Sequence, residues 1–518
     1  MKKCKINRVN KGKVVLPRED KKNILITSAL PYVNNVPHLG NIIGCVLSAD
    51  VYARWCRLRG YNTLYICGTD EYGTATETKA LAEGKTPQEI CDYYHAIHKT
   101  IYEWFDCDFD HLGRTSTPAQ TKICQEIFKK LHERQMLVED TLKQPHCGKC
   151  NRFLADRFVH GICPHCKYED ARGDQCDSCG KLLDPAELIE PKCHLCSSTP
   201  VIKDTKHLFL DLPKIAPELE KFIEKNSVEG GWSQNSITIT KSWLKQGLKP
   251  RCITRDLKWG VPVPLEGYED KVFYVWYDAP IGYISITANY TDQWEKWWKN
   301  PENVKLVQFM GKDNVPFHTV MFPSTLLGTG ENWTLLNTLS TTEYLNYEKG
   351  LKFSKSRGTG VFGDSAAQTK IPSEVYRYQL LINRPENSDT EFNWDDFQAK
   401  INNELIANIG NLCNRILKFI YEKMDKVHPH LNFSNIIRKF PNSRSKTCLR
   451  ETTLSSTKSM KSSRSTMPTS KKSKLRLPLR SPWKQVLFAT STCKTKSLGR
   501  RRISPLRDLM LFWESLLT

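Results

Sequence analysis

Residues 27–41 constrain the fold of this chain more than any other stretch. They read Thr-Ser-Ala-Leu-Pro-Tyr-Val-Asn-Asn-Val-Pro-His-Leu-Gly-Asn. An apolar run, Ile24 to Ile26, enters the stretch and predicts a buried strand, and an amphipathic pattern begins at Ile42. A strand, a polar turn and a helix start together aim backbone N–H groups and a helix dipole at an anion. Taken alone, an ordinary strand-to-helix loop would explain the pattern equally well.

A second polar turn follows the next expected strand. We predict a helix over residues 41–59 and a strand over 63–67, which ends in Gly-Thr-Asp-Glu-Tyr-Gly at 68–73. The carboxyl ends of parallel strands line the ligand crevice of an α/β sheet. Asp70 is therefore a candidate site residue, although a helix N-cap or a surface turn would also use Asp here. Residues 87–135 predict further helix.

Eight cysteines form four Cys-x-x-Cys pairs between residues 147 and 196. The pairs are Cys147/Cys150, Cys163/Cys166, Cys176/Cys179 and Cys193/Cys196. Two thiolates at this spacing bind one tetrahedral metal ion, with Zn–S distances of about 2.3 Å. We expect two structural Zn²⁺ sites, with the two inner pairs forming one site and the two outer pairs closing around them. The pairing is open at this stage. Zinc knuckles also favour a reducing compartment over a secreted disulfide pattern.

The second half of the chain returns to strands, turns and a charged loop. We predict a short strand over 237–240, a strand running into a helix over 271–283, and strands over 307–312 and 334–339. Residues 350–358 then place three cations and two serines between glycines, a composition suited to wrapping a polyphosphate. A solvated charge run would look the same in isolation. Residues 397–420 carry apolar residues at steps of three and four, which predicts a long amphipathic helix.

The net charge of +20 is concentrated at the C-terminal end. Residues 431–518 hold 20 Lys and Arg against 3 Asp and Glu, a net of +17, which leaves +3 for residues 1–430. The first 430 residues therefore have the balance of a near-neutral enzyme, and any nucleic acid would meet local patches. No run of 18 apolar residues exists, so we expect no membrane span.

The tail after about residue 427 differs in character from the rest. Residues 443–480 are low-complexity Ser, Lys, Arg and Thr with no hydrophobic period, so we expect disorder. Our hypothesis is that this segment derives from a translated intron, a frameshift or a gene-model artefact. An intact conventional reading frame in the aligned genomic sequence would contradict it.

Several motifs together resemble one enzyme family. Pro37-His-Leu-Gly-Asn41 resembles the HIGH signature of class I aminoacyl-tRNA synthetases, and Leu351-Lys-Phe-Ser-Lys-Ser356 resembles their KMSKS loop. The segments 29–32, 68–73 and 274–283, with the Cys-x-x-Cys knuckles, resemble methionyl-tRNA synthetases of the archaeal and eukaryotic cytosolic branch. The resemblance covers about residues 22–424 and keeps the motif order.

The resemblance implies a fold class and a domain order. The fold is an α/β, Rossmann-type doubly wound parallel sheet with a zinc-knuckle connective insertion and a partial α-helical anticodon-binding domain. The implied segments are a flexible basic start (1–22), the first catalytic half (23–135), the insertion (136–248), the second catalytic half (249–365), a stem-contact region with the first anticodon-domain helix (366–427) and the tail (428–518).

The resemblance also implies chemistry and site residues. The enzyme would be a cytoplasmic methionine–tRNA ligase that forms methionyl-adenylate from L-methionine and ATP with Mg²⁺, then transfers methionine to tRNA(Met). The catalytic residues would be His38, Asn41 and Lys355, with Pro37, Gly40, Lys352, Ser354 and Ser356 completing the ATP site. The methionine pocket would comprise Leu30, Tyr32, Asp70, Trp276, Ala279, Pro280, Tyr283 and His318. Asn411 and Arg415 would contact the anticodon, and other synthetases or scaffold proteins are potential partners.

Two departures and two alternatives accompany this interpretation. Asn41 stands where many class I enzymes have a second His, and Phe353, which we interpret as a packing residue, stands where Met is usual. The helices that follow the first anticodon-recognition helix are absent, so we expect tRNA charging to be weakened more than adenylate formation. The alternatives are another class I synthetase or nucleotidyltransferase, and a catalytically inactive zinc-bearing tRNA-binding or scaffold protein.

Overall fold

The computed structural model describes residues 13–424 apart from 155, 174, 175, 177, 180, 182, 356 and 357. It consists of two compact units, and the boundary lies between Phe392 and Asn393. Ser356 and the tail from residue 428 lie outside the described residues, so the expectations on them stay predictions.

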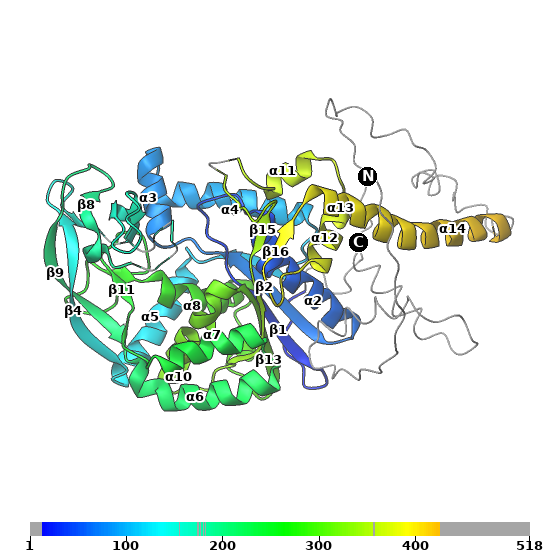
Figure 1. Cartoon of the computed structure of the whole chain (residues 1–518). Helices are drawn as coiled ribbons and strands as arrows, with labels where there is room; N and C mark the ends of the chain where they lie inside the picture. The colour runs from blue at the N-terminus through cyan, green and yellow to red at the C-terminus, as the bar shows by residue number, and fades with distance from the viewer. Residues whose placement is uncertain are drawn as a thin grey trace, which may run out of the picture. The chain divides into compact units, whose positions relative to one another are not determined.

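Unit 1 contains a five-stranded, wholly parallel sheet (Figure 1). Its strands, in spatial order, are β14 (Leu336–Thr342), β13 (Val304–Gly311), β1 (Asn23–Ser28), β2 (Asn62–Thr69) and β3 (His111–Arg114). All six residues of β1 are buried, as its central place requires. The sheet reverses its winding direction at β1, which confirms the doubly wound parallel fold.

The helical segment after β1 matches the expectation of one helix over 41–59. It consists of α1 (Leu39–Asn41), the π-helical η1 (Ile42–Val46) and α2 (Leu47–Leu58). Buried apolar side chains recur along it, including Ile42, Val46 and Cys56. A π-type turn directly after a polar turn is a frequent feature of functional sites.

The expectation of further helix over 87–135 is confirmed for two segments and wrong for the strand between them. The structure has α3 (Thr74–Glu83) and α4 (Pro87–Trp104), then edge strand β3, then α5 (Pro118–Glu133). Thr117 caps α5 by accepting from the Gln120 N–H, and Pro118 occupies its first turn. β3 is only four residues long and pairs with β2 alone, so its sequence carries too short a pattern to reveal a strand.

Strand β12 is shorter than the sequence suggests. It spans Val272–Phe273 and pairs with β11 (Thr254–Arg255), after which α8 (Val275–Tyr290) begins. The aromatic motif at 274–283 therefore lies mostly on a helix. Helix α9 (Glu295–Trp298) precedes β13, which is followed by η4 (Lys312–Asn314), η5 (Phe317–Met321) and α10 (Phe322–Gly328).

The cysteine-rich insertion is built on antiparallel strands at one end of unit 1 (Figure 1). Strands β4 (Leu137–Cys147) and β9 (Val201–Leu210) form a long ladder flanked by β5 (Arg152–Phe153) and β10 (Arg251–Cys252). A second small sheet holds β7 (Ala171–Arg172), β6 (Val159–Ile162) and β8 (Ile189–Cys193), with short turns η2 (Asp156–Phe158) and η3 (Pro185–Glu187).

The short strand expected at 237–240 was also wrong, because the segment lies inside a helix. Helix α6 (Leu212–Glu229) leads to α7 (Gln234–Lys245). The hydroxyl of Thr238 donates to the Gln234 carbonyl at 2.9 Å, and that of Thr240 donates to the Ser236 carbonyl at 2.8 Å. These bonds give the Thr hydroxyls a partner inside the helix, where a β-branched residue is otherwise less favourable. The buried side chains, Ser236 and Thr240, lie four residues apart, as one face of a helix requires.

Unit 1 ends with β15 (Leu345–Tyr347), α11 (Gly363–Gln368), α12 (Ser373–Ile382) and β16 (Thr390–Phe392), and β15 pairs with β16. The described part of unit 2, residues 393–424, is a helical run of α13 (Trp394–Lys400), η6 (Ile401–Gly410) and α14 (Asn411–Met424), which confirms the expected long helix. Among the helices described, none combines the length and apolarity that crossing a bilayer requires.

Candidate active site

The turns that follow β1 and β2 lie side by side, as the ends of neighbouring parallel strands predict. Asp70 donates its backbone N–H to the Pro31 carbonyl at 2.9 Å, and Val33 donates its own to the Asp70 carbonyl at 3.3 Å. The bridge between Tyr32 and Asp70 continues the β1–β2 pairing beyond the strands. Segments 27–41 and 68–73 therefore form one continuous rim.

His38 and Asn41 cap the helix that follows this rim. The Asn41 N–H donates to His38 Nδ1 at 3.3 Å, and the His38 N–H donates to Asn41 Oδ1 at 3.1 Å. Because Nδ1 accepts, the proton of a neutral imidazole lies on Nε2. Burial lowers the pKa of His38 to about 4, so the ring is neutral at pH 7. The arrangement leaves the Nε2–H of His38 and the amide NH₂ of Asn41 as the donors for an anion.

The charged loop is attached to this cap through the backbone. Leu39 donates its N–H to the Val361 carbonyl at 3.1 Å, and Gly363 donates its own to the Pro37 carbonyl at 2.9 Å. In the loop, Lys355 Nζ lies 3.4 Å from a carboxylate oxygen of Asp364, and both side chains are about half exposed. The structure thus brings the loop lysine to the segment that carries His38.

The other predicted phosphate-site residues lie on the same two segments. Pro37 is buried, and a Cβ on Gly40 would come within 2.9 Å of the His38 ring. Lys352 is exposed, and Ser354 exchanges two backbone hydrogen bonds with Thr359, at 2.8 and 2.9 Å.

Two of the residues predicted to line the methionine pocket, Tyr283 and His318, form a hydrogen-bonded pair. His318 Nδ1 lies 2.8 Å from the Asn314 carbonyl, and its Nε2 lies 2.8 Å from Tyr283 Oη. A carbonyl only accepts, so Nδ1 carries the proton and Tyr283 donates its O–H to Nε2. Burial lowers the pKa of His318 to about 4, which keeps this pattern at neutral pH. The hydroxyl oxygen of Tyr283 keeps lone pairs for a further contact.

The remaining predicted pocket residues come from α8 and the first turn. Trp276 packs against Phe317 of η5 with ring centroids 4.8 Å apart. A Cβ on Gly282 would lie 2.9 Å from Leu30 Cδ1, so this close approach requires glycine. Ala279 is half-buried and Pro280 is buried within α8, whereas Tyr32 is 50% exposed at the rim.

Two buried carboxylates occupy the inner side of the site. Burial raises the pKa of Asp70 well above its usual range, and electrostatic repulsion by the nearby carboxyl groups of Asp278 and Glu71 adds to the effect. Burial likewise raises the pKa of Asp278. Among the described residues, Oδ1 of Asp70 and both carboxylate oxygens of Asp278 have no hydrogen-bond partner. Sequence reasoning missed Asp278, although an acid inside the aromatic motif 274–283 was the available signal.

Glu71 fixes the turn that presents Asp70, and the sequence analysis did not single it out. The side chain is fully buried and accepts from Arg114 Nε at 2.8 Å and from the Thr69 hydroxyl at 2.8 Å. Ser116 donates to its second oxygen, and Trp259 Nε1 donates to its backbone carbonyl at 2.7 Å. A buried carboxylate with this many hydrogen-bond donors has its acceptor capacity filled, so Glu71 can hold the turn in place.

The eight Cys-x-x-Cys cysteines gather in two groups. One holds Cys147, Cys150, Cys193 and Cys196, and the other holds Cys163, Cys166, Cys176 and Cys179; within each group the sulfur atoms lie within 4.8 Å of one another. The grouping is the one expected from the sequence order. The S···S distances of 3.5, 3.9 and 3.6 Å are close to the tetrahedral edge of about 3.8 Å that Zn–S bonds of about 2.3 Å generate. Both groups therefore fit a four-coordinate thiolate-bound metal ion.

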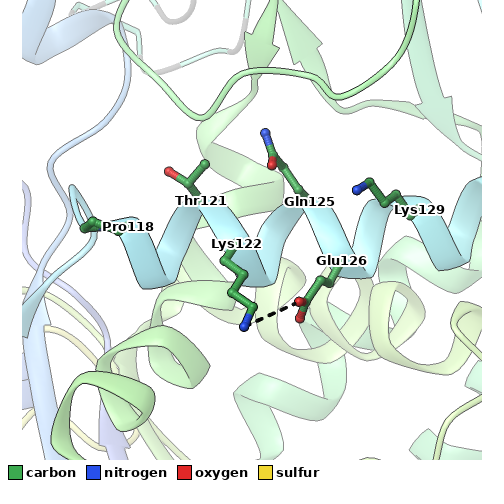
Figure 2. A pocket seen from close by; sticks show the side chains of 6 residues that line it. All are labelled: Pro118, Thr121, Lys122, Gln125, Glu126 and Lys129. Atoms are coloured by element: carbon green, nitrogen blue, oxygen red, sulfur yellow. Dashed lines mark ion pairs between the residues drawn. The ribbon is translucent and has the colours of Figure 1, made fainter. Parts of the chain in front are cut away.

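A surface groove of about 460 Å³ lies elsewhere on unit 1 (Figure 2). Its lining comes entirely from α5, where Lys122 and Glu126 pair at 4.0 Å. None of the residues predicted to bind substrate lines it. In unit 2, Asn411 and Arg415 lie one turn apart and exposed on α14, with Asn411 Nδ2 donating to the Ala407 carbonyl at 2.9 Å.

Comparison with solved structures agrees with this fold. A Mycobacterium tuberculosis methionyl-tRNA synthetase bound by methionyl-adenylate superposes with a TM-score of 0.60 at 21% identity, covering 78% of this chain and 73% of that one. At this identity the likeness establishes the fold alone.

Sequence comparison identifies the family. The chain is 69% identical over 406 residues to a probable cytoplasmic methionine–tRNA ligase of Dictyostelium discoideum, covering 78% of this chain and 55% of that protein. It is 68% identical to the Arabidopsis thaliana cytoplasmic methionine–tRNA ligase (78% and 51%) and 63% identical to the human one (78% and 45%). The chain thus spans about half the length of these curated relatives. The family model "tRNA synthetases class I (M)" matches residues 24–417. The chain belongs to this family of class I tRNA synthetases.

Proposed function

We propose that this chain activates L-methionine with ATP and serves as the catalytic part of a cytoplasmic methionine–tRNA ligase. The observation that carries the proposal is an identity of 63–69% over more than 400 residues to proteins named as such ligases. The geometry supports it, since a neutral His38 donor, a loop lysine and a Tyr283–His318 pair all belong to unit 1.

In the first step a carboxylate oxygen of methionine attacks the α-phosphorus of ATP. A P–O bond forms, the bond between the α-phosphorus and its bridging oxygen breaks, and pyrophosphate leaves with the electron pair. His38 Nε2–H and the Asn41 amide donate to the phosphates at the start of α1. Lys355 neutralises the charge that develops on the leaving pyrophosphate, with Lys352 and Ser354 beside it on the loop. Preorganised donors and cations of this kind stabilise the negative charge that develops in the transition state.

The methionine side chain would lie against Trp276, Leu30 and the Tyr283 hydroxyl. Aromatic and apolar walls suit a polarisable thioether, and the hydroxyl oxygen of Tyr283 offers it one polar contact. Asp70 would accept from the substrate ammonium. Bringing a cation beside the partnerless Oδ1 of Asp70 would lower its raised pKa and favour the carboxylate.

In the second step the terminal ribose hydroxyl of tRNA(Met) attacks the carbonyl carbon of the adenylate. A new ester bond forms, AMP leaves with the electron pair of the broken bond, and the hydroxyl proton passes to solvent or to AMP. We propose tRNA(Met) as the partner, with Asn411 and Arg415 contacting its anticodon. By analogy with the family, we also propose other synthetases or scaffold proteins as partners.

Metal ions enter this proposal in two places. Zn²⁺ would be held by the two four-cysteine groups and would stabilise the insertion, because four thiolates leave no open coordination position for catalysis. Mg²⁺ would accompany ATP and supply charge neutralisation on its phosphates.

The decisive measurement is amino-acid-dependent ATP–pyrophosphate exchange with the purified chain. We expect exchange with methionine and little with leucine, isoleucine or glutamine. Lys355→Ala should lower the exchange rate on the order of 10²–10³-fold, as loss of one transition-state donor does. Lys305→Ala, an exposed lysine on β13, is the matched control and should leave the rate unchanged. Exchange that is absent, or equal for all amino acids, would overturn the proposal.

A further inference from the structure

The loop after β15 contacts the His38 ring directly through Phe353. The two rings are stacked, with centroids 4.6 Å apart and planes only 3° from parallel. Phe362, on the other side of the loop, meets the same imidazole edge-on at 6.1 Å and 84°. Loop side chains therefore contact the His38 ring both face to face and in a T-shaped arrangement, two geometries that aromatic rings prefer.

The loop backbone is shaped to bring Phe353 to this position. A Cβ on residue 360 would come within 2.3 Å of Phe353 Cδ1, and Gly360 has a φ of +114°, so only glycine fits beneath the ring. The backbone bonds from Leu39 to Val361 and from Gly363 to Pro37 anchor the same end of the loop. Phe353 is thus held on His38 from two directions.

The stacking affects Nε2, the one ring atom of His38 that can donate. Nδ1 accepts a hydrogen bond from the Asn41 N–H, and the main motion left to the ring is a tilt about that hydrogen bond. A parallel aromatic face removes this freedom and fixes the direction of Nε2–H. Catalytic donors lose much of their effect when they are misplaced by about 1 Å.

We propose that Phe353 is a positioning residue that holds the imidazole plane of His38, so that the donor is aligned when the loop is folded over it. The inference rests on the proposed function and deepens it. Phe353 does not touch the reacting atoms; it acts through His38 and links loop position to donor direction. This role goes beyond the packing role that the sequence alone suggested.

The test compares Phe353→Leu, which keeps an apolar side chain without a ring, with Phe353→Tyr, which keeps the ring. In methionine-dependent ATP–pyrophosphate exchange, we expect Phe353→Leu to lower kcat about 10-fold or more while the KM for methionine stays within about 2-fold, since one misaligned donor is lost from the transition state. Phe353→Tyr should retain kcat. Tyr93→Leu, an exposed aromatic on α4, is the control and should match the unaltered chain.

A spectroscopic measurement separates alignment from simple loss of structure. With ¹³C-labelled histidine, the His38 ring signal, identified by its loss in His38→Gln, should be shifted upfield by the stacked ring. The shift should vanish in Phe353→Leu and persist in Phe353→Tyr, while the His318 signal stays in place. An unchanged kcat or an unchanged His38 signal in Phe353→Leu would overturn the inference. An unaltered chain that shows no methionine-dependent exchange would instead overturn the proposed function.

Discussion

Asp50 and Arg377 form a buried ion pair at 2.8 Å, with side chains 0% and 1% exposed. Asp50 lies on α2, the helix that continues from His38, and Arg377 lies on α12, which follows the loop that carries Lys355. Arg54 Nε donates to the same carboxylate at 3.0 Å, and the Asp108 N–H donates to its other oxygen at 2.7 Å. Every charge in this cluster is thus paired, and the two helices that flank the site are tied together.

Breaking this pair should destabilise unit 1 strongly. Asp50→Asn leaves Arg377 and Arg54 facing a neutral amide in a buried site, and stranding a buried charge costs about 3–5 kcal/mol. Arg377→Met should cost less, because Arg54 still pairs with Asp50. Urea unfolding followed by tryptophan fluorescence measures both changes. Arg18→Met, which breaks an exposed pair with Asp20, is the control and should leave the midpoint in place. Equal midpoints for all three variants would contradict this prediction.

Because His98 is buried, the free energy of unfolding should fall as the pH is lowered. Its Nε2–H donates to the Asn35 carbonyl at 2.9 Å, and burial lowers its pKa from 6.5 to about 4. Above pH 6.5 both states are neutral and His98 adds no pH dependence. Between pH 6.5 and 4 the unfolded chain binds a proton that the folded chain does not, so the free energy of unfolding falls.

His98→Gln keeps a donor but removes the titration. Buried groups of both signs titrate in this chain, so only the difference between the two proteins isolates His98. From pH 7 to pH 5 the unaltered chain should lose about 1–2 kcal/mol more than the variant. Unfolding midpoints at both pH values give this difference. An equal loss of stability in the two proteins would show that protonation of His98 does not destabilise the folded chain.

Asp278 should have the opposite effect, because it makes the free energy of unfolding fall as the pH rises. Its pKa is raised by burial, so its contribution is fully present below the unfolded pKa of 3.8 and is lost as pH rises through the folded value. Asp278→Asn cannot ionise. The variant should therefore gain stability relative to the unaltered chain as pH rises from 4 to 8, by an amount on the order of a few kcal/mol. Thermal melts at pH 4, 6 and 8 measure it, and a constant difference across this range would argue against a protonated Asp278.

The two cysteine groups should bind two metal ions per chain. Elemental analysis of the purified protein should find two equivalents of zinc, and Cys147→Ser should reduce this to about one, because three thiolates hold the ion less tightly. Cys413→Ser, a cysteine outside both groups, is the matched control and should keep two. Zinc content unaffected by Cys147→Ser would contradict the four-thiolate site.

Much of the site could be predicted from the sequence because it depends on local motifs. The strand before the first turn, the helix after it and the metal-ligand spacing each leave a pattern within about fifteen residues. Such patterns directly indicate the spacing of buried residues and the residue types that turns require. The resemblance then joined the first turn to the loop around Lys355, which local patterns alone could not do.

The missed features depend on contacts between distant segments. Edge strand β3 exists because β2 offers it a pairing edge, and the segment 237–240 lies in a helix whose Ser236 and Thr240 hydroxyls bond to Thr341 and Thr319 at 2.6 and 3.0 Å. Asp278 is buried beside Asp70 only once α8 packs under the turn that presents it. Phe353 looks like any loop aromatic until the fold places it on His38. Tertiary context of this kind overrides local propensity.

The pairing of residues 37–39 with 361–363 has a consequence for biosynthesis. His38 leaves the ribosome early, but the backbone segment and the ring that fix it are made more than 300 residues later. At about 5–20 residues per second, this delay lasts tens of seconds. During that time the segment around His38 lacks the backbone partners that residues 361–363 supply. The candidate active site therefore stays incomplete until almost the whole of unit 1 has been synthesised.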